Sequence, residues 1–192
     1  MTDTSPAPSD AKTFPQLVRA AAAAYGDEVA VTLEAETIPD DVATFRDLDE
    51  KSAALARGLL ARGVGKGQRI GFIQGNSPMF AILLAAIARI GAVAVPISTL
   101  IKANELVRVL RQSDISGLIV HRTMLGHDYV KRLVEAMPTL ASAKSNDLRL
   151  VEAPYLRWIA SWGSDLPASF AAVEEIIAGG ESVSDDLLLA VE

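Results

Sequence analysis

The stretch between Thr44 and Val120 alternates amphipathic helical segments with short apolar segments. A helix exposed on one side has apolar residues at a spacing of three or four, whereas a buried strand reads as a short apolar run. Helices that alternate with short apolar strands build α/β domains with a largely parallel sheet. We therefore expect a three-layer α/β domain whose sheet is flanked by helices. The expected helices cover 44–63, 77–91 and 103–113, and the expected strands cover 69–74, 92–97 and 117–120.

Local signals define where several of these segments begin and end. Thr44 is followed three residues later by Asp47, which is a variant of the capping box at a helix start. Ser77 and Pro78 are typical of the N-cap and the first position of a helix. Gly91 is typical of a helix end.

The segment from Met79 to Ile97 is 19 residues long and nearly all apolar, so it resembles a membrane span. It contains Arg89, Gly91 and Pro96, however, and the part after Gly91 is rich in valine. A bilayer span needs about 20 consecutive apolar residues in one helix. We therefore expect a buried helix followed by a buried strand, and no membrane span.

Weaker sequence patterns predict the structure of the regions on either side of this stretch. We expect residues 1–12 to be a disordered leader, because they are polar and contain proline and serine. We expect residues 13–180 to form the α/β domain, and residues 181–192 to be a tail that leads into a missing remainder of the protein. Further expected elements are a helix at Phe14–Tyr25, a strand at Val29–Glu34, a turn at Ile38–Asp41, a helix at Tyr129–Met137, a strand at Leu156–Trp162 and a helix at Phe170–Ile177.

Charge and cysteine content exclude some classes of protein. The formal net charge is −6, from 18 Lys and Arg against 24 Asp and Glu, and basic residues are not clustered. Neutralising nucleic-acid phosphates requires clustered cations, so nucleic acid is not expected as a partner. The chain has no cysteine, which excludes disulfides and thiol chemistry. A reducing compartment fits this absence, and we expect a cytoplasmic protein.

Most motifs that suggest chemistry have a simpler structural explanation. The glycines of 63–67 follow a helix and precede a strand, whereas a phosphate loop follows a strand and opens a helix. Ser77 lacks the second glycine of a nucleophile elbow. His121 and His127 have neither cysteines nor carboxylates at a zinc-site spacing. We therefore assign no catalytic residue and no metal ligand.

One polar group, formed by Ser98, Thr99 and Lys102, is a candidate binding site. These residues follow the expected strand at 92–97 and precede the helix at 103–113. Open α/β sheets bind ligands at the carboxyl ends of their strands, where helix amides are also available. Two hydroxyls and a cation there suit a polar, anionic ligand. The alternative is a solvated lysine at a helix start.

The order of these motifs resembles the AMP-forming acyl-CoA synthetases, the adenylate-forming enzymes. The resemblance rests on TFRDLDEKSAALARGLLARGVGKGQRIGFIQGNSPMF and AAIARIGAVAVPISTLIKANELVRVLRQSDISGLIV. It covers Phe14–Val120 well and Tyr155–Gly180 loosely. Two positions depart from the family pattern: Gln68 stands where Asp is usual, and Ser113-Asp114 replaces an Asp-Ser pair. Each motif alone is weak, but their order and spacing are specific.

The resemblance implies the N-terminal subdomain of an enzyme that uses ATP, Mg²⁺ and coenzyme A to activate a carboxylic acid. The acid first forms an acyl-adenylate and pyrophosphate, and the acyl group then passes to coenzyme A. The family's Ser/Thr/Gly-rich phosphate loop, its Tyr-Gly-x-Thr-Glu pattern and its catalytic lysine have no counterpart in this sequence. In relatives the phosphate loop begins shortly after a position like Glu192. We therefore expect this chain alone to be inactive.

The resemblance also suggests that Ser98, Thr99 and Lys102 face coenzyme A. The expected partners are the remainder of the chain and a small carboxylic acid, and a homodimer stays open. The identity of the acid, and an acceptor other than coenzyme A, are not determined by the sequence. The alternative hypothesis is a free-standing Rossmann-like binding or oligomerisation module without catalysis.

Overall fold

A five-stranded sheet is the framework of one of the two units into which the chain folds. The computed structural model describes residues 7–34, 40–144 and 147–192. The helical unit comprises Met1–Lys66, Asn76–Gly91 and Gly179–Glu192, and the sheet unit comprises Gly67–Gly75 and Ala92–Ala178.

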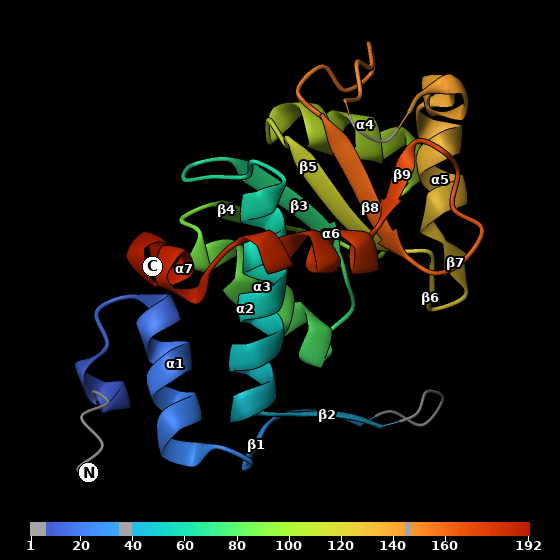
Figure 1. Cartoon of the computed structure of the whole chain (residues 1–192). Coiled ribbons are helices and arrows are strands. Elements are labelled where there is room, and N and C mark those ends of the chain that lie inside the picture. The colour runs from blue at the N-terminus through green and yellow to red at the C-terminus, as the bar shows by residue number, and fades with distance from the viewer. Residues whose placement is uncertain (1–6, 35–39, 145–146) are drawn as a thin grey trace. The chain divides into compact units, whose positions relative to one another are not determined.

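All five strands of this sheet run parallel, in the order β4-β3-β5-β8-β9 (Figure 1). The predicted α/β class with a largely parallel sheet is therefore confirmed. Ile73 of β3 lies opposite Ile97 of β4 and Val120 of β5, so these apolar side chains share one face of the sheet. The strands are β3 (Arg69–Ile73), β4 (Val93–Ile97), β5 (Gly117–His121), β8 (Trp158–Trp162) and β9 (Phe170–Ala172).

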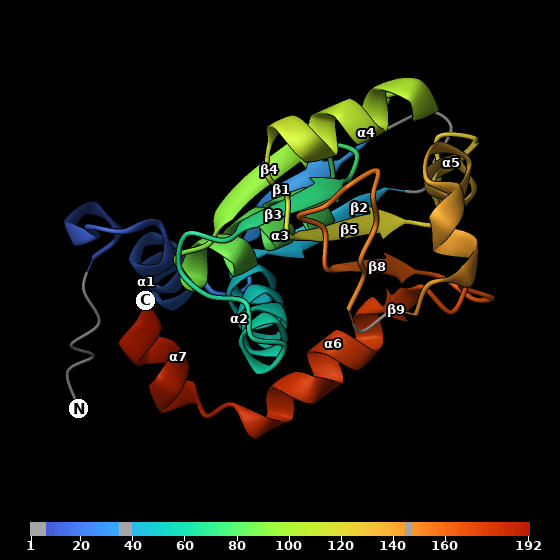
Figure 2. The ribbon, with the colours of Figure 1, turned by 90° about the horizontal axis from the view of Figure 1, so that it is seen from above.

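The helices α4 (Ala103–Gln112) and α5 (Tyr129–Ala136) contribute to the core of the sheet unit. Leu106 and Leu133 are fully buried in a cluster that also holds Ile73 and Val120 from the sheet. Figure 2 shows α4 running along one face of the strands. The other elements of this unit are a two-stranded ribbon of β6 (Thr123–Met124) and β7 (His127–Asp128), a 3-10 helix at Pro138–Ser142, and α6 (Val173–Gly179).

The helical unit is built on α2, whose start has the predicted capping box. The Asp47 amide donates to Thr44 Oγ1 at 3.0 Å, and the Thr44 amide donates to Asp47 Oδ2 at 3.1 Å. Lys51 and these bonds lower the pKa of Asp47 to about 2. The elements of this unit are α1 (Phe14–Tyr25), an antiparallel pair of β1 (Val29–Leu33) and β2 (Asp41–Thr44), α2 (Phe45–Ala61), α3 (Pro78–Arg89) and α7 (Asp185–Val191).

The apolar segment Met79–Ile97 contains a helix and a strand, as predicted. Ser77 occupies the N-cap position of α3, but its side chain makes no capping bond, and Gly91 follows the helix with a φ of 65°. The strand is not buried as expected, because β4 is at an edge of the sheet and only Ile97 in it is buried. An edge strand explains why Pro96, which lacks an amide hydrogen, is tolerated there. Among the described residues no helix has both the length and the apolar content to span a bilayer.

Three other expectations need correction. Asp41, assigned to a turn, is the first residue of β2, while positions 35–39 lie outside the described residues. Phe170–Ala172 forms β9, and the helix expected at 170–177 begins only at Val173. Helix α7 occupies Asp185–Val191, where no element was expected.

The predicted leader, residues 1–12, lies partly outside the described residues, and its described part has a 3-10 helix at Pro8–Asp10.

The ring of Trp158 on β8 lies over Gly117 on the neighbouring strand β5, so this position requires glycine. The two residues lie opposite each other on β5 and β8, and a Cβ at Gly117 would overlap the indole ring. We predict that Gly117→Ala lowers the free energy of unfolding by about 1–3 kcal/mol, because the core is overpacked. Urea denaturation followed by circular dichroism measures the change.

The matched control is Gly65→Ala, because no atom of the described residues lies within 4 Å of the added methyl group at Gly65. That variant is expected to keep the wild-type stability or gain slightly. Equal stabilities of the two variants would contradict the assigned position of Trp158.

Candidate functional site

The loop between β4 and α4 carries the polar residues that the sequence selects. Ser98 and Lys102 are exposed, and Thr99 is half-buried. Ser98 Oγ accepts a hydrogen bond from the Leu100 amide at 3.2 Å, so this hydroxyl closes a local turn. The Lys102 amide donates to Glu105 Oε2 at 3.1 Å, so Glu105 helps to cap α4. No cap was predicted for this helix, although Glu at the third position of a helix is the usual signal for one.

Helix α5 fixes the backbone of this loop. The Tyr129 hydroxyl donates to the Thr99 carbonyl at 2.9 Å, and the Arg132 guanidinium donates to the Ile101 carbonyl at 2.6 Å. Arg132 also lies 5.1 Å from the centroid of the Tyr129 ring, a cation–π distance. Burial raises the pKa of Tyr129, and the nearby charge of Arg132 partly opposes this. The loop is therefore held from α5 by two side chains that sequence reasoning did not select.

A shallow hollow of about 480 Å³ lies beside the loop and along α4. Ser98 lines the hollow, whereas Thr99 and Lys102 do not. The three predicted residues thus share one loop without lining one pocket. The lining residues are Ser98, Leu100, Ile101, Glu105, Arg108, Val109 and Gln112.

The carboxyl ends of β5 and β8 bring His121 and Trp162 together. The two residues lie opposite each other in the sheet, and their rings stack with centroids 4.7 Å apart. Burial lowers the pKa of His121, although the charge of Glu174 opposes the shift. His127 instead lies with its ring edge-on to Tyr129. Across residues 7–34, 40–144 and 147–192, no three His, Cys, Asp or Glu side chains gather as metal ligands would.

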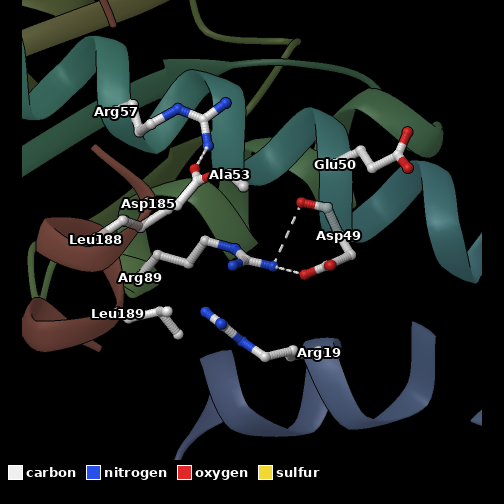
Figure 3. A pocket seen from close by; sticks show the side chains of 9 residues that line it. All are labelled: Arg19, Asp49, Glu50, Ala53, Arg57, Arg89, Asp185, Leu188 and Leu189. Atoms are coloured by element: carbon white, nitrogen blue, oxygen red, sulfur yellow. Dashed lines mark hydrogen bonds and ion pairs between the residues drawn. The ribbon is translucent and has the colours of Figure 1, made fainter. Parts of the chain in front are cut away.

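A second pocket, of about 330 Å³, lies in the helical unit and is lined mainly by charged side chains (Figure 3). Arg89 of α3 is at its centre and is 1% exposed. Its guanidinium forms an ion pair with Asp49 and donates to Ser52 Oγ at 2.9 Å, both on α2. The lining residues are Arg19, Asp49, Glu50, Ala53, Arg57, Arg89, Asp185, Leu188 and Leu189.

Glu192 joins this group from the end of α7. Its carboxylate pairs with Arg89 at 2.7 Å and with Arg19 of α1. We call Arg19, Asp49, Ser52, Arg89 and Glu192 the Arg89 cluster. Its acids and bases are paired with one another, which suits a structural role rather than proton transfer. In the sequence, Arg89 indicated only that the apolar segment is not a membrane span.

Comparisons with known proteins give a consistent result. Residues 18–183 match the family model described as AMP-binding enzyme. YngI of Bacillus subtilis (strain 168), assigned as an acyl-CoA synthetase, is 32% identical over 145 residues, which are 76% of this chain and 26% of YngI. The mitochondrial medium-chain acyl-CoA ligase ACSF2 of Rattus norvegicus is 29% identical over 137 residues, 71% of this chain and 22% of the relative. The chain therefore spans about a quarter of the length of these relatives.

Solved structures show the same fold at low sequence identity. Acetoacetyl-CoA synthetase from Streptomyces lividans superposes with a TM-score of 0.70 at 23% identity, covering 86% of this chain and 25% of that chain. The long-chain-fatty-acid-CoA ligase FadD1 from Archaeoglobus fulgidus superposes with a TM-score of 0.65 at 23% identity. The match covers 88% of this chain and 30% of that chain. At this identity the likeness establishes the fold alone.

The anchoring role of Tyr129 is open to a direct test. Tyr129→Phe removes the hydroxyl that donates to the Thr99 carbonyl and leaves the buried ring in place. We predict a loss of about 0.5–1.5 kcal/mol of stability, the usual net contribution of one such hydrogen bond. Tyr155→Phe is the matched control, since Tyr155 is 54% exposed. Equal urea midpoints for the two variants would refute the anchor.

The shifted pKa of His121 predicts a dependence of stability on pH. The unfolded chain binds a proton at His121 near pH 6.5, whereas the folded chain binds it only at a lower pH. Between these two pKa values the unfolded state binds more protons than the folded state, so the free energy of unfolding falls as the pH drops below about 6.5. We expect His121→Gln to remove this part of the decline. A parallel pH dependence of melting temperature in both proteins would contradict the assignment.

Proposed function

Because the chain belongs to the AMP-binding enzyme family, we propose that it is the N-terminal part of an AMP-forming acyl-CoA synthetase. The observation that carries the proposal is the family match across residues 18–183, together with relatives assigned as acyl-CoA synthetase or ligase. In the proposed reaction of the full-length protein, a carboxylate oxygen attacks the α-phosphorus of ATP and pyrophosphate leaves. The thiol of coenzyme A then attacks the acyl carbon, and AMP leaves.

We assign a scaffold role to this chain within that reaction. The sequence has no Ser/Thr/Gly-rich phosphate loop to hold ATP. No group of metal-ligand side chains occurs in the part of the chain that the structure describes, so we assign no step at Mg²⁺ to these residues. A small carboxylic acid as substrate and the cytoplasmic location stay predictions. The alternative is a free-standing Rossmann-like binding or oligomerisation module without catalysis. A stop codon after Glu192 would support that module, and a phosphate loop there would support the synthetase.

Activity measurements on two lengths of the protein test the proposal. We expect the full-length protein to catalyse carboxylate-dependent exchange of pyrophosphate into ATP with at least one acid from a panel. The 192-residue chain is expected to show only the rate of the no-enzyme control, because this chemistry depends on positioned phosphate-binding groups. Exchange by the 192-residue chain would refute the scaffold role, and no exchange by the full-length protein with any acid would refute the reaction.

We further propose that Lys102 contacts a phosphate of coenzyme A in the full-length enzyme. Lys102 is exposed and shares with Ser98 and Thr99 the loop between the carboxyl end of β4 and the start of α4. The helix dipole favours anions at a helix start. Because Glu105 already accepts a hydrogen bond from the Lys102 amide there, the lysine side chain is the group that we assign to the phosphate.

Replacement of Lys102 tests this contact. A charge-assisted hydrogen bond contributes about 1–3 kcal/mol, so Lys102→Ala should raise the KM for coenzyme A roughly 5- to 100-fold. The pyrophosphate exchange rate should not change. Lys131→Ala, at an exposed lysine of α5, is the control. An unchanged KM would show that Lys102 is only solvated, and a lost exchange reaction would indicate a structural role.

A further inference from the structure

Helix α7 is attached to its unit by few apolar contacts. It has seven residues, fewer than an isolated helix needs to be stable in water. Leu188 is buried at 3% exposure, but Leu187 and Leu189 are 51% and 50% exposed. Leu188 is the one residue of this helix that is buried. Other interactions must therefore contribute to holding α7.

Ion pairs hold α7 at both of its ends. At the start, Asp185 pairs with Arg57 of α2 at 2.6 Å (Figure 3). At the end, Glu192 pairs with Arg89 of α3 and Arg19 of α1. Ion pairs thus connect α7 and the residue that follows it to α1, α2 and α3.

The two ends differ in their exposure to solvent. The Asp185 side chain is 82% exposed, whereas those of Glu192 and Arg89 are 4% and 1% exposed. Salt screens an exposed pair strongly and a buried pair much less. Loss of one partner from a buried pair is costly, because the other charge stays buried without compensation. The Glu192 end is therefore the stronger attachment.

The segment that enters α7 is held separately. A Cβ at Gly180 would lie 2.6 Å from the backbone nitrogen of Gly58, so the 3-10 turn at Gly180–Ser182 packs directly on the backbone of α2. This packing of the turn on α2 does not depend on an ion pair. Detachment of α7 can therefore begin after this turn while the turn stays in place.

We propose that α7 is a strap that is held closed by its ion pairs to Arg57, Arg89 and Arg19, and that opens when these pairs are lost. Apolar burial of Leu188 is the lesser contribution. The proposal concerns the helical unit alone and is independent of the proposed reaction.

Hydrogen exchange of the 192-residue chain, measured by mass spectrometry, tests the strap at the Glu192 end. Glu192→Gln keeps the shape of the side chain and removes its charge. We expect amides in the peptide covering α7 to exchange at least about tenfold faster, while peptides covering α2 keep wild-type protection. Leu188→Ala should have the smaller effect on α7. A larger effect of Leu188→Ala, or unchanged exchange in Glu192→Gln, would overturn the proposal.

A second pair of variants tests the exposed end, where loss of folding is not expected. Asp185→Asn and Asp186→Asn make the same change at neighbouring exposed positions in the first turn of α7, and of the two only Asp185 has a described ion pair. We expect faster exchange in α7 for Asp185→Asn at 20 mM NaCl, and no difference between the variants at 1 M NaCl. Equal exchange at both salt concentrations would refute the role of Arg57, and with it the attachment at both ends.

Discussion

Parallel pairing of β3 with both β4 and β5 is the constraint on which the sheet unit depends. Parallel strands cannot be joined by a tight turn, so each connection requires a crossover segment. The alternation of helices and strands along the chain is the direct consequence. It also brings the carboxyl ends of the strands to one edge, where open α/β sheets bind ligands. Ser98, His121 and Trp162 all lie at this edge because the sheet is parallel.

Side chains from outside the strands position the β4–α4 loop at this edge of the sheet. Tyr129 and Arg132 of α5 hold two carbonyls of the β4–α4 loop, and this places Lys102 at the start of α4. The predicted residues Ser98, Thr99 and Lys102 supply polar groups, but α5 supplies the geometry. A loop whose backbone is fixed in this way loses less conformational entropy when a ligand binds.

The helical unit has a different organisation, because its central buried group is a charge. Arg89 occupies the last turn of an otherwise apolar helix and is stabilised by Asp49, Ser52 and Glu192. A buried guanidinium needs such partners, since its transfer out of water is costly. The same requirement connects α2 and α7 to α3. Charge, and not only apolar packing, therefore organises these helices.

Periodicity and capping were sufficient to predict α1 to α5, the strands β3, β4, β5 and β8, and the capping box of α2, because these signals act within a few residues. The sequence did not predict the partners of Arg89, since Glu192 lies 103 positions away. It also did not predict the strand β9 or the helix α7, which are short and depend on contacts with distant segments. Sequence alone therefore determined the α/β class and the candidate loop. Only the folded loop shows that Lys102 lies outside the adjacent hollow. Tertiary structure decided that Tyr129 and Arg132 anchor the loop, because these hydrogen bonds join residues about 30 positions apart.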